Sequence, residues 1–310
     1  MENSFALLFV NIATSWVVPK AHRGREHIFN AFHTYYASRG HERGSSLAKS
    51  RYYAAERNGT PLKDIAKFEL GGLFGMLINT VPCTFWVTLD VFSDPRLLQD
   101  IRDEMSTAIV SSSRDAVQCI NVGRMKQTCA LLPSVFQETL RTRSTGSSIR
   151  RVREDFLLAD RYLLKKNSML QMPFAIISEN KDLWGESAKE YNPRRFIKSS
   201  KSFEGKKQAI IKPGIFRGFG GGTTLCPGRH FATTEITSVV AMLAMRFEIL
   251  PVAAEGWGMP RQVTNHGATS VLPPEKDIKV KIVRRKGFES CEWRFDMNGL
   301  KAEFVPGNES

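Results

Sequence analysis

The hydrophobic pattern is dominated by an apolar run over residues 60–93, which predicts one long helix. Thr60-Pro61 provides a hydroxyl N-cap with a proline at the first helical position, and Asp94-Pro95 stops the run. A helix that is hydrophobic on most of its sides belongs in the middle of a domain. Pro82 removes one backbone hydrogen bond from this helix, so we expect a bend near that residue.

Helical spacing of apolar residues recurs elsewhere, and short strands account for the rest. Further helices are predicted in a looped region at 19–57 and at 131–143. Asp94-Pro95 opens another helix, whose apolar side carries Leu97, Leu98, Ile101 and Met105. The last predicted helix follows Cys226, and its apolar side carries Phe231, Ile236, Val239, Val240, Leu243 and Phe247. A strand, a turn and a second strand are predicted within 149–166, and short strands with turns within 247–283. The tail from Lys286 is polar and is expected to be peripheral. The pattern favours a mainly α fold with small β-sheets (α+β).

Composition and charge restrict the class of protein. The 310 residues are 42% hydrophobic and 24% charged, which is ordinary for a soluble globular domain with a sizeable core. The formal net charge of +13 favours an acidic partner or an anionic surface. We expect no nucleic-acid partner, because the sequence contains no zinc finger, RNA-binding aromatic signature or basic zipper.

The cysteines and the start of the chain bear on its location. Five scattered cysteines without a CxxC pair, at positions 83, 119, 129, 226 and 291, argue for a reducing, cytosol-facing location. The apolar stretch from Phe5 to Val18 is shorter than the ~20 residues that span a membrane. Glu2 stands where a signal peptide would carry positive charge. We therefore expect no transmembrane anchor within this chain, and interpret the stretch as the end of a buried or membrane-facing helix.

Cys226 lies in a glycine-rich turn that leads directly into a helix. Residues 219–232 read Phe-Gly-Gly-Gly-Thr-Thr-Leu-Cys-Pro-Gly-Arg-His-Phe-Ala. The glycines let the backbone approach whatever Cys226 contacts, and they allow positive φ in a tight hairpin. Backbone N–H groups and the positive end of the following helix favour a thiolate, which is a good axial ligand for haem iron. One alternative is a surface turn with an incidental cysteine; a phosphate cradle is excluded because the loop lacks the Gly-Lys-Ser/Thr ending of a P-loop.

The pattern Phe219-x-x-Gly222-x-x-x-Cys226-x-Gly228 resembles the haem-binding signature of the cytochromes P450. The resemblance implies that Cys226 is the axial ligand of the iron of haem b. It also implies the cytochrome P450 fold without its N-terminal part, with the whole chain forming the C-terminal portion of one catalytic domain. The implied parts are lid helices at 1–57, an oxygen-activating helix at 60–93, a Glu-x-x-Arg helix at 131–143, a haem-cysteine loop and helix at 219–247, and a peripheral tail at 286–310.

The long apolar helix resembles the oxygen-activating helix of that family, and comes closest to the branch of the sterol 7α-hydroxylases and prostacyclin synthases. Gly75 stands where the helix carries a small residue over the haem. Thr80 would steady the bound dioxygen by hydrogen bonding, and Asn79 replaces the carboxylate that most members have before the threonine. From its residues alone, the helix can equally be a kinked core helix.

Glu138-x-x-Arg141, with Arg195 following in Tyr-Asn-Pro-Arg-Arg-Phe, resembles the family's buried Glu-Arg-Arg triad. The alternative is that Glu138 and Arg141 form an exposed pair on one helix, which would stabilise that helix by only about 0.2–0.5 kcal/mol. By the same comparison Arg150 or Arg151 could pair with a haem propionate, although strand-edge solubility explains these arginines equally well. Segments 144–148 and 264–270 would face the substrate, and the basic loop 198–212 would lead to the cysteine hairpin.

The resemblance implies a haem-thiolate monooxygenase that inserts oxygen into a lipophilic substrate, sterol-like or a secondary metabolite. NADPH-cytochrome P450 reductase would supply the electrons, and a full-length form would sit at the cytosolic face of the endoplasmic reticulum membrane. Two alternatives are a reductase-independent rearrangement of an oxygenated lipid and a truncated, non-catalytic remnant without stable haem. The chain departs from the family by lacking its front part, and by having Thr224 where most members have an arginine or histidine for a propionate.

Overall fold

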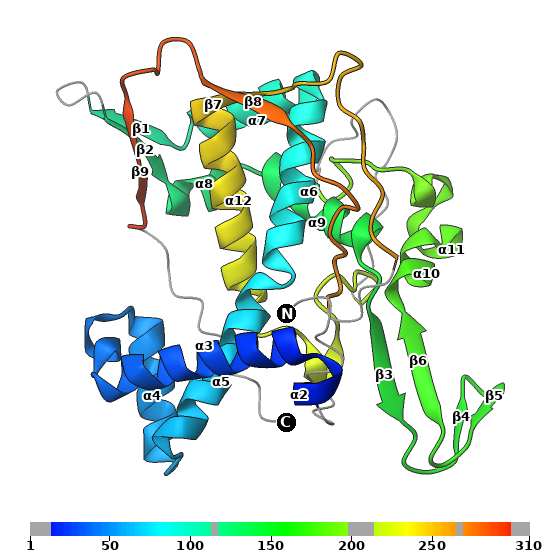
Figure 1. Ribbon diagram of the computed structural model, residues 1–310. Coiled ribbons are helices and arrows are strands. Elements are labelled where there is room, and N and C mark those ends of the chain that lie inside the picture. The colour runs from blue at the N-terminus through cyan, green and yellow to red at the C-terminus, as the bar shows by residue number, and fades with distance from the viewer. Residues whose placement is uncertain (1–13, 113–116, 198–213, 265–268, 299–310) are drawn as a thin grey trace. The chain divides into compact units, whose positions relative to one another are not determined.

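The computed structural model describes residues 14–112, 117–197, 214–264 and 269–298 (Figure 1). The chain forms two compact units: Met1–Val81 with Thr264–Thr269, and Pro82–Val263 with Ser270–Ser310. Helices dominate both units, and all of the sheets are small. The predicted mainly α fold with small sheets is therefore confirmed.

The first unit is helical throughout its described part. Its elements are α2 (Thr14–Val17), α3 (Pro19–Ala37), the 3₁₀ turn η2 (Gly40–Arg43), α4 (Ser46–Arg57) and α5 (Leu62–Leu77). The Ser45 side chain caps α4 by accepting from the Ala48 N–H at 3.3 Å. His41 is buried and stacks on the Tyr52 ring with centroids 3.7 Å apart, which joins η2 to α4. The looped helical region predicted at 19–57 is thus confirmed.

The long apolar run is two helices rather than one. After α5 the chain turns through Ile78 and Asn79 and enters α6 (Thr80–Ser93). The predicted bend thus falls just before Pro82, in the turn whose hydrogen bond the proline cannot make. At the start of the run, Pro61 has extended backbone angles and is itself the N-cap, one residue later than predicted.

The second unit is a helical core with small sheets at its edges. Its remaining helices are α7 (Pro95–Ser106), α8 (Val122–Thr128), α9 (Leu131–Arg143), α10 (Phe174–Glu179), α11 (Lys181–Trp184), η3 (Glu186–Lys189), η4 (Gly222–Thr224) and α12 (Arg229–Arg246). The core joins residues of α6, α7, α9 and α12, which include Trp86, Ile101, Phe136, Ile236 and Val240. Figure 1 shows α6 and α12 as neighbouring helices in this core.

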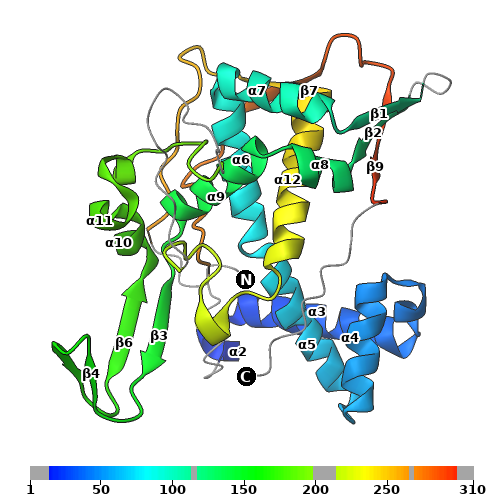
Figure 2. The same cartoon turned by 180° about the vertical axis from the view of Figure 1, so that it is seen from behind.

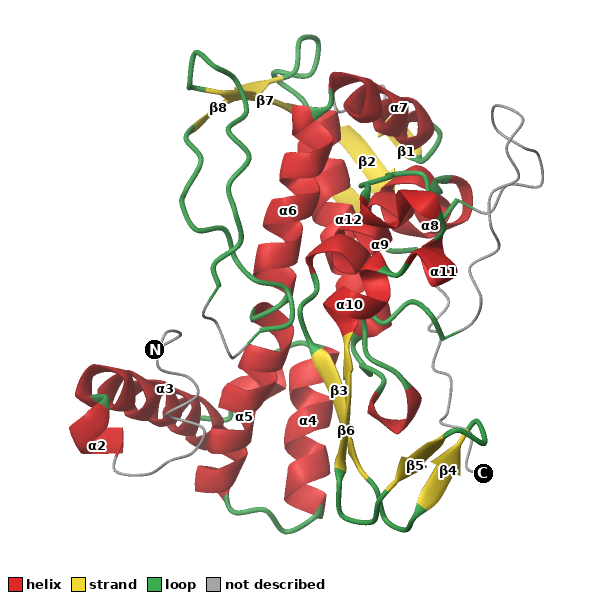
Figure 3. Ribbon diagram, turned by 90° about the vertical axis from the view of Figure 1, so that its right-hand side faces the viewer, coloured by secondary structure: helices red, strands yellow, loops and turns green. Residues whose placement is uncertain are grey.

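Among the described residues, the strands pair in four small sheets. β1 (Ile109–Ser112), β2 (Val117–Asn121) and β9 (Glu292–Asp296) form one sheet in that order, and the paired strands are β3 (Ser147–Arg151) with β6 (Met169–Pro173), β4 (Phe156–Leu158) with β5 (Tyr162–Leu164), and β7 (Phe247–Pro251) with β8 (Val280–Arg284). Figure 3 shows the β3–β6 ladder with the short β4–β5 hairpin beyond its end. The strand, turn and second strand predicted within 149–166 are found as the β4–β5 hairpin, whereas β3 at the start of that range pairs with β6 beyond its end.

Two further predictions about burial are wrong. The tail from Lys286 is not wholly peripheral, since β9 pairs in parallel with β2 and buries Trp293 (Figure 2). On α12, Phe231 and Val239 are exposed, and Phe247 belongs to β7. Ile236 and Val240 are buried as predicted, and the other buried residues of α12 are Thr237, Ser238, Ala241, Ala244 and Met245. Small residues on the buried side allow α12 to pack closely against its neighbours.

Within the described part of the chain, one stretch, Leu62–Ser93, is long and apolar enough to cross a membrane. Its mean hydropathy reaches 1.4 over the most apolar window. The core helix of a soluble protein meets the same criterion, and the second half of this stretch is buried in the core of the second unit. Most of the segments 5–18, 198–212 and 264–270, for which the sequence suggests specific roles, lie outside the described residues.

Candidate functional site

The cysteine loop is a hairpin closed by its own backbone. The Cys226 N–H donates to the Phe219 carbonyl at 3.0 Å, and the Leu225 N–H donates to the Gly222 carbonyl at 3.1 Å. Gly220 and Gly222 have φ values of 80° and 61°, which other residues adopt only with strain. The glycine run predicted to make a tight turn with positive φ therefore does so, and it places Cys226 at the end of the hairpin.

Helix α12 begins three residues after Cys226, so its positive end lies beside the thiol. The Cys226 carbonyl accepts from the Arg229 N–H at 3.4 Å and from the Arg229 guanidinium at 3.2 Å. A Cβ built at Gly228 would lie 3.8 Å from the Cys226 Sγ. The glycine thus keeps that side of the sulfur clear of side-chain atoms.

Arg150 of β3 reaches the cysteine loop, and its neighbour Arg151 does not. The Arg150 Nη2 donates to the Thr224 Oγ1 at 2.7 Å and to the Gly221 carbonyl at 3.1 Å. The Arg151 guanidinium donates to Asn167 at 2.8 Å instead. Successive side chains of a strand point to opposite faces, so only one of the two arginines can face the loop. A cation therefore stands at Thr224, where the loop itself has none.

The three residues of the predicted triad form one buried network. The Glu138 carboxylate is fully buried and accepts from the Arg141 Nε and Nη2, both at 2.8 Å. It also accepts from the Arg195 Nε at 3.1 Å and from the Asn192 N–H at 2.8 Å. The two guanidinium groups donate onward to the carbonyls of Ser178, Ser187, Ala188 and Glu190. The triad therefore ties α9 to the segment that runs from α10 to Arg195.

The structure also pairs the buried Asp90 of α6 with the half-buried Arg143 of α9, a contact that the sequence did not predict. The two side chains are 2.6 Å apart, and Thr139 also donates to Asp90. Burial raises the pKa of Asp90, and Arg143 opposes that rise. The Arg143 guanidinium lies over the Trp86 ring at 4.2 Å. The signal available in the sequence was the single carboxylate in an apolar helix.

The predicted residues of the oxygen-activating helix lie in the first unit, and the cysteine loop lies in the second. Gly75 is in α5, Asn79 is in the turn after it, and Thr80 opens α6. The Thr269 hydroxyl lies 2.7 Å from the Asn79 Oδ1 and 3.2 Å from the Ile78 carbonyl oxygen. Thr269 had been predicted only as part of a hairpin tip facing the substrate.

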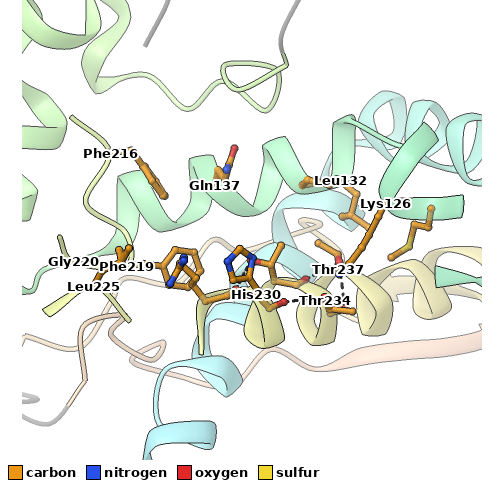
Figure 4. Close-up of a pocket in the computed structure, with 14 residues that line it drawn as sticks. Lys126, Leu132, Gln137, Phe216, Phe219, Gly220, Leu225, His230, Thr234 and Thr237 are labelled. Carbon is orange, nitrogen blue, oxygen red and sulfur yellow. Dashed lines mark hydrogen bonds between the residues drawn. The ribbon is translucent and has the colours of Figure 1, made fainter. Parts of the chain in front are cut away.

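A cavity of about 560 Å³ lies beside the cysteine loop within the second unit (Figure 4). Residues of α8, α9, the loop and the first half of α12 line it. Apolar side chains such as Leu132 and Phe219 form part of its wall. Two basic residues, Lys126 and Arg229, also line it, so the protein presents positive charge next to the cysteine hairpin.

Comparison with known proteins identifies the class to which this fold and loop belong. The profile of the cytochrome P450 family matches residues 18–281. This chain belongs to the cytochrome P450 family.

Individual relatives agree with that assignment. The cytochrome P450 monooxygenase nodJ of Hypoxylon pulicicidum is 32% identical over 96% of this chain, and a cytochrome P450 monooxygenase of Gibberella zeae is 28% identical over 95%. The 25-hydroxycholesterol 7-alpha-hydroxylase of Rattus norvegicus is 26% identical over 74% of the chain. The chain spans 59%, 58% and 55% of the lengths of these three relatives.

Proposed function

We propose that this chain carries the haem-thiolate centre of a cytochrome P450 monooxygenase, with Cys226 as the axial ligand of haem b. The observation that supports this most directly is the hairpin, which holds the Cys226 backbone while Gly228 leaves the sulfur approachable. The donor set fits the group, because a thiol beside a helix N-terminus is accompanied by the Arg150 guanidinium on the same loop. Haem bound there would supply activation of dioxygen, and thiolate ligation favours O–O cleavage.

Each of the other site residues has a role in this proposal. Arg150, held at Thr224, would pair with a propionate, whereas Arg151 is turned to Asn167. Phe219, Gly222 and Gly228 shape the hairpin, and Glu138, Arg141 and Arg195 hold the core behind it. Thr80 and Asn79 would order hydrogen bonds around the oxygen, next to Gly75 as the small residue. An amide cannot act as an acid, so Asn79 can only orient donors and acceptors here.

The partners follow from charge and from the family. Lys126 and Arg229 at the cavity form a basic surface beside the loop, which suits an acidic flavoprotein such as NADPH-cytochrome P450 reductase. NADPH would then act only through that reductase. We propose a lipophilic substrate, either a sterol-like molecule or a secondary metabolite. For a full-length form we propose the cytosolic face of the endoplasmic reticulum membrane, where free thiols such as the five in this chain persist.

A carbon monoxide difference spectrum tests the centre directly. The purified chain, expressed with haem supplied and then reduced, should show the strongly red-shifted Soret band of a thiolate-ligated haem. Cys226→Ala should lose that band, because the only ligand proposed for the iron is removed. Cys119→Ala, which removes a half-buried thiol of β2, should keep it. A band that is absent from the haem-supplied wild type, or that survives Cys226→Ala, would refute the assignment.

Two alternative functions are distinguished from this proposal by experiment. Asn79 stands where a proton donor would be expected, which favours a reductase-independent rearrangement of an oxygenated lipid; that reaction would proceed without NADPH. The other alternative is a non-catalytic remnant without stable haem. A purified chain that never acquires haem would support the remnant.

A further inference from the structure

The break between α5 and α6 leaves a backbone carbonyl that its own helix cannot satisfy. In a continuous α-helix, the Ile78 carbonyl would accept from the N–H of residue 82. Residue 82 is a proline, which has no N–H. The Thr269 hydroxyl lies 3.2 Å from the Ile78 carbonyl oxygen. It therefore supplies a donor where Pro82 has removed one.

The same hydroxyl also contacts the side chain of Asn79. The Thr269 Oγ1 and the Asn79 Oδ1 are 2.7 Å apart, which is the usual length for an O–H donor to an oxygen acceptor and short for an N–H donor. A hydroxyl has one hydrogen, so Thr269 shares it between the Ile78 carbonyl and the Asn79 amide oxygen. Both acceptors belong to the two residues that separate the helices.

The orientation of the Asn79 amide follows from this contact. A carboxamide has an acceptor at one end and two N–H donors at the other. When Thr269 holds the oxygen end, the N–H donors are turned away from Thr269. Thr80, the first residue of α6, follows Asn79 directly in the chain. Thr269 therefore determines which end of the Asn79 amide, the oxygen or the N–H groups, is turned toward the hydrogen-bonding groups near Thr80.

We infer that Thr269 is a positioning residue, which acts through Asn79 to orient the donors that guide protons at the α5–α6 break. This inference rests on the proposed monooxygenase function. Thr269 lies 190 positions after Asn79 in the chain, and no helix-local pattern connects the two residues. The pair is neutral, so it orders hydrogen bonds without needing a charged group in an apolar helix.

The experiment compares Thr269→Val, which removes only the hydroxyl, with Thr269→Ser, which keeps it. Thr107→Val is the matched control, because the exposed Thr107 hydroxyl donates to the Glu104 carbonyl at the C-terminal end of α7. The first readout is amide hydrogen exchange over residues 77–84, which requires no bound cofactor. Thr269→Val should speed exchange there about fivefold, the effect of one lost hydrogen bond. Thr269→Ser and Thr107→Val should leave it unchanged.

The second readout is the ratio of NADPH consumed to hydrogen peroxide released, measured with NADPH-cytochrome P450 reductase. Reduction of dioxygen to peroxide uses one NADPH, and full reduction to water uses two. Poorer proton delivery should therefore move the ratio of Thr269→Val toward one NADPH per peroxide, while Thr269→Ser keeps the wild-type ratio. In an Asn79→Leu background, Thr269→Val should have no further effect on the ratio, because Thr269 acts through Asn79.

The outcomes separate this inference from the proposed function. Faster exchange with an unchanged ratio would show that Thr269 is only structural, and unchanged exchange would show that the contact is not made; either result overturns the inference. A Thr269→Ser protein that does not keep the wild-type ratio of NADPH consumed to hydrogen peroxide released would overturn the inference as well. Loss of the carbon monoxide band from every variant, wild type included, would refute the monooxygenase assignment and with it the proton-guiding role, whatever the exchange result.

Discussion

Removing the Glu138 carboxylate should strongly destabilise the second unit. Glu138 is fully buried and balances two arginines whose side chains are 1% and 8% exposed. In Glu138→Ala, four hydrogen-bond donors from Arg141, Arg195 and the Asn192 backbone lose the carboxylate that accepts five hydrogen bonds from them. Breaking a buried ion pair by removing one partner costs about 3–5 kcal/mol, because a buried charge is left without compensation. That loss is comparable to the whole stability of many domains, roughly 5–15 kcal/mol.

The assay for Glu138→Ala is urea unfolding followed by circular dichroism, together with the haem content of the purified protein. We expect either no soluble protein or a strongly lowered unfolding midpoint, with no haem retained. Glu186→Ala is the matched control, since its partner is the exposed Lys181 and such pairs contribute about 0–1 kcal/mol. A soluble Glu138→Ala protein that binds haem fully and unfolds at the wild-type urea concentration would refute the reasoning.

Two further predictions concern single residues. Burial and the nearby Glu69 raise the pKa of Tyr36 to about 12 from 10.0. Its neutral form therefore stabilises the fold fully below pH 10, and that contribution is lost as the pH rises toward 12. Burial also raises the pKa values of Tyr52 and Tyr191, so an ultraviolet titration of the six tyrosines should show more than one late phenol, and Tyr36→Phe should remove the transition near pH 12; a titration curve that Tyr36→Phe leaves unchanged would contradict the prediction. Gly220→Ala places a Cβ 3.2 Å from the Thr224 carbonyl oxygen at a φ of 80°, so thermal unfolding should show about 1–2 kcal/mol of destabilisation and the protein should retain haem less well. The control is Gly258→Ala, whose Cβ has no described atom within 4 Å and which should leave stability unchanged. Equal melting temperatures for the two variants would contradict the strain proposed for the hairpin.

Helix positions with local signals were predicted well. Asp94 caps α7 by accepting from the N–H groups of Arg96 and Leu97, and the four apolar residues predicted on one side of α7 are all buried. The buried side of α12 was predicted less well, because its apolar residues are spread around the helix and small residues take the core contacts. Periodicity identifies a helix, but only its neighbours determine which side is covered.

The sequence by itself determined the class of this protein. The Asn79-Thr80, Glu138-x-x-Arg141 and Cys226 motifs are each formed by residues close together in the chain. Each motif, and the order of the three, can therefore be recognised without knowledge of the fold. The glycines around Cys226 likewise predicted a turn with positive φ, because few other residues adopt it.

Only the tertiary structure decided which distant groups meet. It selected Arg150 over Arg151 for the cysteine loop, paired Asp90 with Arg143, and brought Thr269 to the carbonyl that Pro82 leaves without a donor. These contacts join residues from 53 to 191 positions apart. Their partners are chosen by strand facing and helix packing in three dimensions, and no spacing along the chain encodes them.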